Sequence, residues 1–178
     1  MRICIVYASR HGATRGIAER LGAALRAEGL EVLVAPVGDA RAADTCEVLV
    51  IGSAAYLGHW LPEATDFVRR NESLLRSRAV WLFTSGPLGT KLVDADGRSV
   101  LEDPKDVAEL ATTLGARGTK VFFGAFDPTE KPRSMSERLV RMMPASKSLL
   151  PPGDFRDWEA IDGWAHEIAA SLREAAAR

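Results

Sequence analysis

Five short apolar runs alternate with segments of helical periodicity along almost the whole chain. The runs that we expect to form strands span residues 2–8, 31–37, 46–52, 79–84 and 120–126. The segments with apolar residues at helical spacing span residues 17–25, 62–75, 104–114 and 159–177. Buried strands that alternate with helices predict a parallel sheet with helices on both of its faces. The pattern therefore predicts a doubly wound α/β fold with three layers, α/β/α, and the strand order 2-1-3-4-5.

The length of 178 residues suggests one domain, 1–178, that buries a substantial core. Residues 86–103 and 127–156 are longer than ordinary connections, and we interpret the second as an insert before the C-terminal helix. The net charge of −1 gives no reason to expect a nucleic acid partner. No apolar run approaches the length of a membrane span, and the first strand follows the N-terminus directly. We therefore expect a cytoplasmic protein without a signal peptide.

The positions of the cysteines and histidines indicate whether disulfides or a metal site are to be expected. Cys4 and Cys46 each lie in an apolar run and form no CxxC pair, which predicts buried thiols in a reducing compartment. His11, His59 and His166 have no partners at metal-ligand spacing. We therefore expect no metal site.

The stretch "SRHGAT" joins the first predicted strand to the first predicted helix. The start of a helix presents unpaired N–H groups and a partial positive charge. Gly12 would allow a phosphate to approach the backbone, and Ser9 and Thr14 would supply hydroxyl donors. The same hydroxyls could simply cap the helix, since Ser and Thr are common caps. The spacing is neither a Walker loop nor GxGxxG.

Two further loops leave buried strands with small and hydroxyl residues. They are "GSAAYLGHW" at 52–60 and "TSGPLG" at 84–89. Small residues let a flat ring approach the backbone, and Tyr56 or Trp60 could stack on such a ring or could cover the core. In a doubly wound sheet the three loops meet at the carboxyl ends of the strands. Together they predict a pocket for a phosphorylated planar ligand.

With these three loops the sequence resembles the flavodoxin family, which binds FMN through loops in the same positions. The resemblance implies a flavodoxin-like fold and FMN as the cofactor. By this resemblance the FMN phosphate would be bound by Ser9, Arg10, His11, Gly12, Ala13 and Thr14. The isoalloxazine ring would be flanked by Ser53, Ala54, Ala55, Tyr56, Leu57, Gly58, Trp60, Ser85, Gly86, Pro87, Leu88 and Gly89.

Within that family the sequence is similar to the flavodoxin-type, menaquinone-linked protoporphyrinogen IX dehydrogenases. The similar blocks are "SRHGATRGIA" (9–18), "VIGSAAYLGHW" (50–60), "GAF" (124–126) and "DWEAIDGWAHEIA" (157–169). The resemblance implies an FMN-dependent oxidoreductase that passes electrons from a reduced, protoporphyrinogen-like substrate to a quinone or another acceptor. We place Tyr56 and His59 at the reacting face as candidate catalytic residues. His59 could instead be a helix-start residue bonded to the backbone.

Three other functions stay open: a flavodoxin-type electron carrier, an NAD(P)H:quinone or flavin reductase, and a flavin-free interaction module. The near-neutral charge disfavours the carriers, which are generally very acidic. The stretch 131–150 combines basic and apolar residues in an amphipathic pattern, which could contact an anionic membrane. Such a contact would suit an enzyme that uses quinones, because quinones reside in the bilayer. The charge-bearing residues are Lys131, Arg133, Arg138, Arg141, Lys147 and Glu137, with Leu139, Val140, Met142 and Met143 among them. A solvated helix or a homodimer interface would fit the same pattern.

Overall fold

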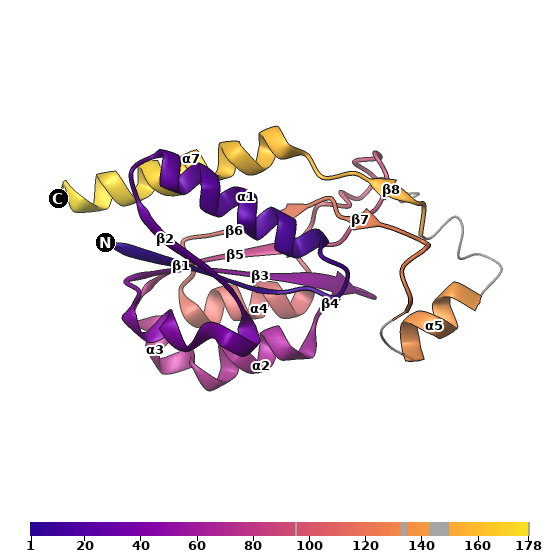
Figure 1. The fold of residues 1–178 in the computed structure, drawn as a ribbon, viewed down its shortest axis with the longest axis horizontal. Coiled ribbons are helices and arrows are strands. Elements are labelled where there is room, and N and C mark those ends of the chain that lie inside the picture. Colours follow the sequence, from indigo (N-terminus) through magenta and orange to yellow (C-terminus); the bar gives the residue numbers. More distant parts are fainter. Residues whose placement is uncertain (95, 133–134, 143–149, 178) are drawn as a thin grey trace.

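A parallel sheet of five strands forms the middle layer of the molecule, in the order β2-β1-β3-β5-β6 (Figure 1). This arrangement confirms the predicted fold and strand order. The strands are β2 (Glu31–Pro36), β1 (Arg2–Ala8), β3 (Val48–Tyr56), β5 (Ala79–Ser85) and β6 (Gly118–Phe122). The computed structural model describes residues 1–94, 96–132, 135–142 and 150–177.

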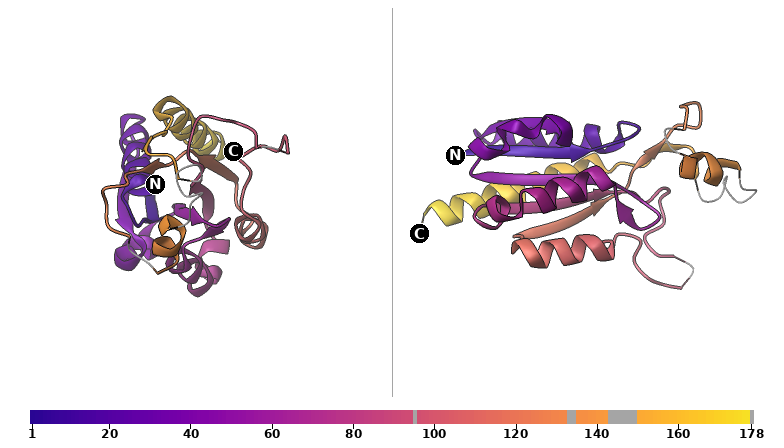
Figure 2. Two further views of the ribbon diagram at one scale, coloured as in Figure 1. Left: turned by 90° about the vertical axis from the view of Figure 1, so that its right-hand side faces the viewer. Right: turned by 90° about the horizontal axis from the view of Figure 1, so that it is seen from below.

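Helices cover both faces of this sheet (Figures 1 and 2). One face carries α1 (Ala13–Ala27) and α7 (Trp158–Ala176). The other face carries η1 (Val37–Thr45), α2 (Pro62–Arg70), α3 (Glu72–Arg76) and α4 (Lys105–Leu114). Successive residues of each strand point to opposite faces, so the continuous apolar runs of the sequence fill two separate cores. Asp157 caps the N-terminus of α7, because its carboxylate accepts a hydrogen bond from the Ala160 N–H at 3.0 Å.

Aromatic rings fill the core under α1 and α7. Phe83 of β5, Phe122 of β6 and Trp164 of α7 pack edge to face, with ring centroids 5.7 to 6.3 Å apart. Gly52 of β3 makes room for them, since a Cβ atom there would lie only 1.9 Å from the Phe83 ring. A side chain at this position is therefore incompatible with the packing of the rings.

The core on the opposite face contains a disulfide between Cys4 and Cys46. The prediction of free buried thiols is therefore wrong, although both residues are buried as expected. Cys4 lies in β1 and Cys46 lies just before the neighbouring strand β3, which brings their Cα atoms to 5.8 Å. Strand pairing between distant segments creates this contact.

Several helices and strands have other bounds in the structure than the sequence predicts. The helix expected over 62–75 is broken at Asn71, whose side-chain amide donates to the Phe67 carbonyl at 2.8 Å. The third strand continues to Tyr56 and returns as β4 (His59–Trp60), which pairs antiparallel with its end. The 3₁₀ segment η1 was not expected.

The strand expected over 120–126 is two strands. The sheet strand β6 ends at Phe122, and β7 (Ala125–Phe126) pairs antiparallel with β8 (Gly153–Asp154). This short ribbon closes the insert at its base, and the insert contains α5 (Met135–Met142) beyond the carboxyl end of the sheet (Figures 1 and 2). Arg133, Met143 and Lys147 lie outside the described residues. None of the described helices is long and apolar enough to cross a membrane.

Candidate functional site

The carboxyl ends of β1, β3 and β5 lie side by side at one edge of the sheet. Ala8 pairs with Ser53, and Ser53 pairs with Thr84. In open parallel sheets a ligand binds beyond these ends, where the direction of connection reverses. The reversal lies between β1 and β3. The three loops that sequence patterns select therefore meet at this edge.

The first loop opens α1 with the features of an anion site. Gly12 has a φ of 82°, which glycine adopts without strain, and its N–H donates to Ser9 Oγ at 3.1 Å. The first turn of α1 carries no acidic residue, so the positive end of the helix is not neutralised there. The Thr14 hydroxyl is fully buried and has no hydrogen-bond partner among the described residues. A buried hydroxyl at a helix start fits the oxygens of a phosphate group.

Both ends of the insert contact this first loop. His11 Nδ1 lies 2.5 Å from a carboxylate oxygen of Glu130, at the beginning of the insert. At its far end, Arg156 donates to the Ala13 carbonyl at 3.4 Å and pairs with Asp154. Hydrogen bonds from the Arg156 guanidinium hold the pKa of the Asp154 carboxyl below its ordinary value.

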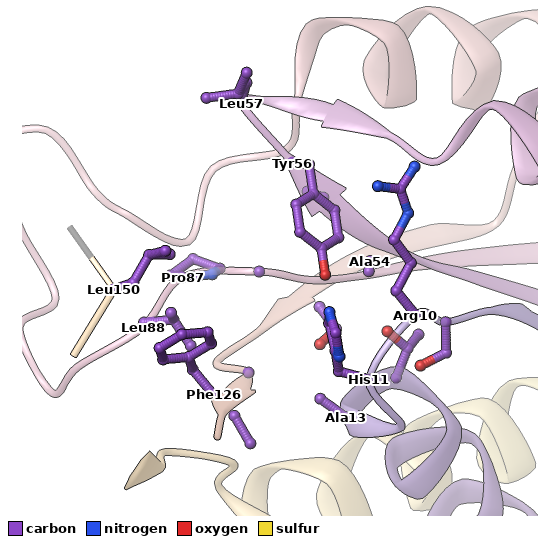
Figure 3. Close-up of a pocket in the computed structure, with 17 residues that line it drawn as sticks. Arg10, His11, Ala13, Ala54, Tyr56, Leu57, Pro87, Leu88, Phe126 and Leu150 are labelled. Carbon is purple, nitrogen blue, oxygen red and sulfur yellow. The ribbon is translucent and has the colours of Figure 1, made fainter. Parts of the chain in front are cut away.

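The second loop is a tight hairpin turn between β3 and β4. Leu57 and Gly58 both have positive φ, 53° and 78°, as a two-residue turn of this kind requires. Tyr56 precedes the turn, and its ring faces the pocket (Figure 3). The Arg10 guanidinium carbon lies 5.1 Å from the centroid of that ring, which is a cation–π contact. Tyr56 is thus held between the first loop and the turn.

Four predicted site residues of the second loop do not line the pocket: Ser53, Gly58, His59 and Trp60. His59 is 71% exposed and forms an ion pair with Asp106 at 3.7 Å. Because the turn directs His59 away from the pocket, the structure gives no support to a catalytic role for it. The Trp60 indole is buried in the core and donates to the Thr84 hydroxyl at 2.9 Å, so it covers the core and does not stack on a ligand there. The Ser53 hydroxyl accepts the Leu61 N–H.

The third loop approaches the second closely. A Cβ atom at Gly86 would lie 3.2 Å from that of Ala55, so a side chain there would crowd the pocket wall. Ser85, Pro87 and Leu88 also line the pocket, whereas Gly89 does not. The third loop therefore forms one side of the site.

The residues that line the pocket come from five stretches of the chain, and two of these stretches were not expected. The pocket has a volume of about 370 Å³. It is lined by Ser9, Arg10, His11, Ala13, Thr14, Ala54, Ala55, Tyr56, Leu57, Ser85, Gly86, Pro87, Leu88, Gly124, Ala125, Phe126 and Leu150. The unexpected stretches are 124–126, which leads into the insert, and Leu150, which lies within it; the "GAF" stretch was noted in the sequence only as a block of similarity. Polar groups of the first loop occupy one end, and Leu88, Phe126 and Leu150 the other (Figure 3).

The flavodoxin domain family matches residues 4–143. The chain belongs to this family. The flavodoxin domain also resembles solved structures in fold. Flavodoxin 2 from Bacillus cereus is 23% identical, with a TM-score of 0.59, and the match covers 97% of this chain and 99% of that one. A flavodoxin from the domain Archaea is 17% identical, with the same TM-score of 0.59 and the same coverage of 97% and 99%.

A larger protein contains the same fold. The rubredoxin oxygen:oxidoreductase of Desulfovibrio gigas is 16% identical with a TM-score of 0.63, and the match covers 99% of this flavodoxin domain but only 37% of that oxidoreductase. No curated protein sequence matches the chain.

Membership of the flavodoxin domain family implies FMN as the cofactor. The pocket fits this group, because the buried Thr14 hydroxyl and the start of α1 match its phosphate. The small residues Ala54, Ala55 and Gly86, which line the pocket beside Tyr56, leave room for a planar ring system. The family assignment and the geometry of the pocket thus agree, and the chain is an FMN-binding electron-transfer protein by family.

Proposed function

We propose that this flavodoxin domain is an oxidoreductase that takes electrons from a small reduced substrate and passes them to a quinone or another acceptor. The observation that carries the proposal is the apolar end of the pocket. Phe126 and Leu150 come from the insert and enclose a side of the pocket next to Leu88. An apolar wall of this kind suits a small hydrophobic substrate.

The chain's own residues would orient the cofactor and the substrate. In this proposal the Thr14 hydroxyl and the N–H groups at the start of α1 bind the phosphate of FMN. Tyr56 contacts the ring, and Arg10 fixes the orientation of Tyr56. FMN would supply the acceptance and release of electrons, and the protein would supply binding and exclusion of water. The electrons and protons that the donor loses would leave in the reduced acceptor, for a quinone as the quinol.

The apolar wall of Leu88, Phe126 and Leu150 favours a donor with a large apolar face. The sequence blocks shared with protoporphyrinogen dehydrogenases make protoporphyrinogen the first donor to test. NAD(P)H and a protein electron donor test the two redox alternatives, a quinone or flavin reductase and an electron carrier.

The experiment compares the FMN-loaded protein with two phenylalanine variants under anaerobic conditions. Phe126→Ala removes part of the wall, and Phe155→Ala removes a ring that follows β8 and does not line the pocket. Phe126 is half-buried, and a bound donor would cover the rest of its ring. We expect Phe126→Ala to lower kcat/KM for an apolar donor about tenfold, because full burial of a phenylalanine contributes roughly 1.5–3 kcal/mol. Phe155→Ala should leave it nearly unchanged. Reduction by a protein partner alone, with no turnover of any small donor, would contradict the proposal and favour an electron carrier.

We also propose that α5 contacts an anionic lipid surface. Met135, Leu139 and Met142 recur at helical spacing and are 78%, 66% and 76% exposed. Lys131 and Arg138 are exposed beside them, so the apolar side chains are accompanied by positive charge. Sedimentation with vesicles should show binding to phosphatidylglycerol, weaker binding to phosphatidylcholine, and loss of binding in Leu139→Glu. The proposal would be overturned if the protein did not bind vesicles but self-associated, and if Leu139→Glu abolished that self-association. The exposed face of α5 would then be a homodimer interface.

A further inference from the structure

One ionisable contact joins the phosphate end of the pocket to the insert. His11 lies between Ser9 and Gly12 in the first loop, and its imidazole lines the pocket. Its Nδ1 atom is 2.5 Å from Glu130 Oε2, although the two residues are 119 positions apart in the sequence. The side chain of His11 is only 11% exposed, and that of Glu130 is 41% exposed. Ser9, Gly12 and Thr14 of the loop offer hydroxyl and backbone N–H groups, so the imidazole of His11 brings a different chemistry to this end.

The carboxylate fixes which nitrogen of His11 carries a proton. An ionised carboxylate accepts hydrogen bonds and cannot donate them, so Nδ1 is the protonated nitrogen in this contact. The other nitrogen, Nε2, then gains or loses the second proton. When it is protonated the ring is a cation, balanced on one side by Glu130, and Nε2–H becomes a donor toward an anion. A phosphate monoester near neutral pH has only acceptor oxygens to offer in return.

Other charged side chains surround the first loop, and the described ones have contacts of their own. The Arg10 guanidinium lies over the Tyr56 ring. Arg156, which reaches the start of α1 from the far end of the insert, is paired with Asp154. Lys131 follows Glu130 and is exposed.

We propose that Glu130 is a positioning residue that holds His11 as an imidazolium for the phosphate group of FMN. The inference rests on FMN as the cofactor and is independent of the electron donor. It assigns the insert a part in cofactor selection, because Glu130 reaches the phosphate end of the pocket only through the folding of the insert against the first loop. The chain would thereby distinguish FMN from riboflavin by a cation as well as by hydroxyls.

The test measures dissociation constants of FMN and of riboflavin by flavin fluorescence for the full-length protein freed of cofactor. The variants are Glu130→Gln, His11→Asn and the control Glu167→Gln, which removes the same charge from the exposed face of α7. We expect Glu130→Gln and His11→Asn each to raise the dissociation constant of FMN about tenfold at pH 7. Both variants should leave the dissociation constant of riboflavin within about twofold, and the two substitutions should combine without a further loss. The control should match the unchanged protein.

Equal weakening of FMN and riboflavin by Glu130→Gln would overturn the proposal, because it would show a structural role for Glu130. That outcome leaves FMN binding intact, so it is distinct from a failure of the cofactor assignment, in which neither flavin binds. If circular dichroism shows that Glu130→Gln does not fold, His11→Asn alone shows whether FMN affinity is lost selectively or together with riboflavin affinity.

Discussion

Leu82 and Phe83 are neighbours on β5, yet the cores that they enter differ in chemistry. Phe83 enters a core where three aromatic rings and a required glycine, Gly52, interlock by shape. Leu82 enters a core that also contains a disulfide and a buried indole hydrogen bond. The first core should respond to changes of volume, and the second to reductant and to changes of polarity. Because α1 rests on the first core, the loop that opens α1 depends on the shape of the aromatic cluster.

The largest effect is expected in the aromatic core. Trp164→Ala should lower the free energy of unfolding by about 3–5 kcal/mol, because the loss of a buried tryptophan leaves a cavity among fixed rings. Urea unfolding followed by circular dichroism measures this, and Trp164→Phe should lose less. A loss below about 1 kcal/mol would show that the ring cluster does not depend on shape in the way that we argue.

The next effect tests the opposite core. The disulfide closes a separation of 42 residues, for which loop entropy predicts about 4 kcal/mol of stabilisation as an upper value. The double variant Cys4→Ala with Cys46→Ala should lose up to that amount in oxidising buffer. Added reductant should destabilise the unchanged protein and have no effect on the double variant. Equal stability of the unchanged protein with and without reductant, after thiol counting confirms reduction, contradicts the expectation.

The smallest effect concerns polarity in that same core. Thr84→Val removes the acceptor of the buried Trp60 N–H and should cost about 1–3 kcal/mol, because the indole N–H remains unsatisfied. Thr84→Ser keeps the hydroxyl and is the matched control. Adding Trp60→Phe to Thr84→Val should cost little more, since the unsatisfied donor is then gone. If Thr84→Val is as stable as Thr84→Ser, the hydrogen bond between Trp60 and Thr84 does not contribute to the stability of this core.

Local sequence patterns predicted the strands, the layers and the first loop. The strands are continuous apolar runs, and the loop combines Ser9, Gly12 and Thr14 with the start of a helix, so short windows contain the whole signal. The position of Thr14 inside the pocket follows from helix geometry alone. These features depend on neighbours in the chain and little on contacts made later.

The features that sequence reasoning missed depend on long-range pairing. His59 was placed at the reacting face as a histidine at the end of a predicted strand. The turn at Leu57–Gly58, which lacks the usual Asn-Gly or Asp-Gly signal, reverses the chain before His59, and His59 does not line the pocket. Phe126 lines the pocket because β7 leaves the sheet and pairs with β8. The contact of Cys4 with Cys46 requires β1 and β3 to be neighbours, and no spacing motif announces it.

The antiparallel pairing of β7 with β8 has a consequence for how such a chain can change in length. Ala125 pairs with Asp154, and Phe126 pairs with Gly153, so the chain leaves the sheet and returns to it at one place. The pairing fixes the two ends of the segment that connects these strands. Each doubling of the length of that segment therefore costs only about 0.6 kcal/mol in loop entropy. Insertions, deletions or a grafted segment between β7 and β8 would therefore leave the strand order and α7 undisturbed. The segment between β7 and β8, which lies beside the pocket, can therefore be exchanged in evolution or by design without a change in the sheet.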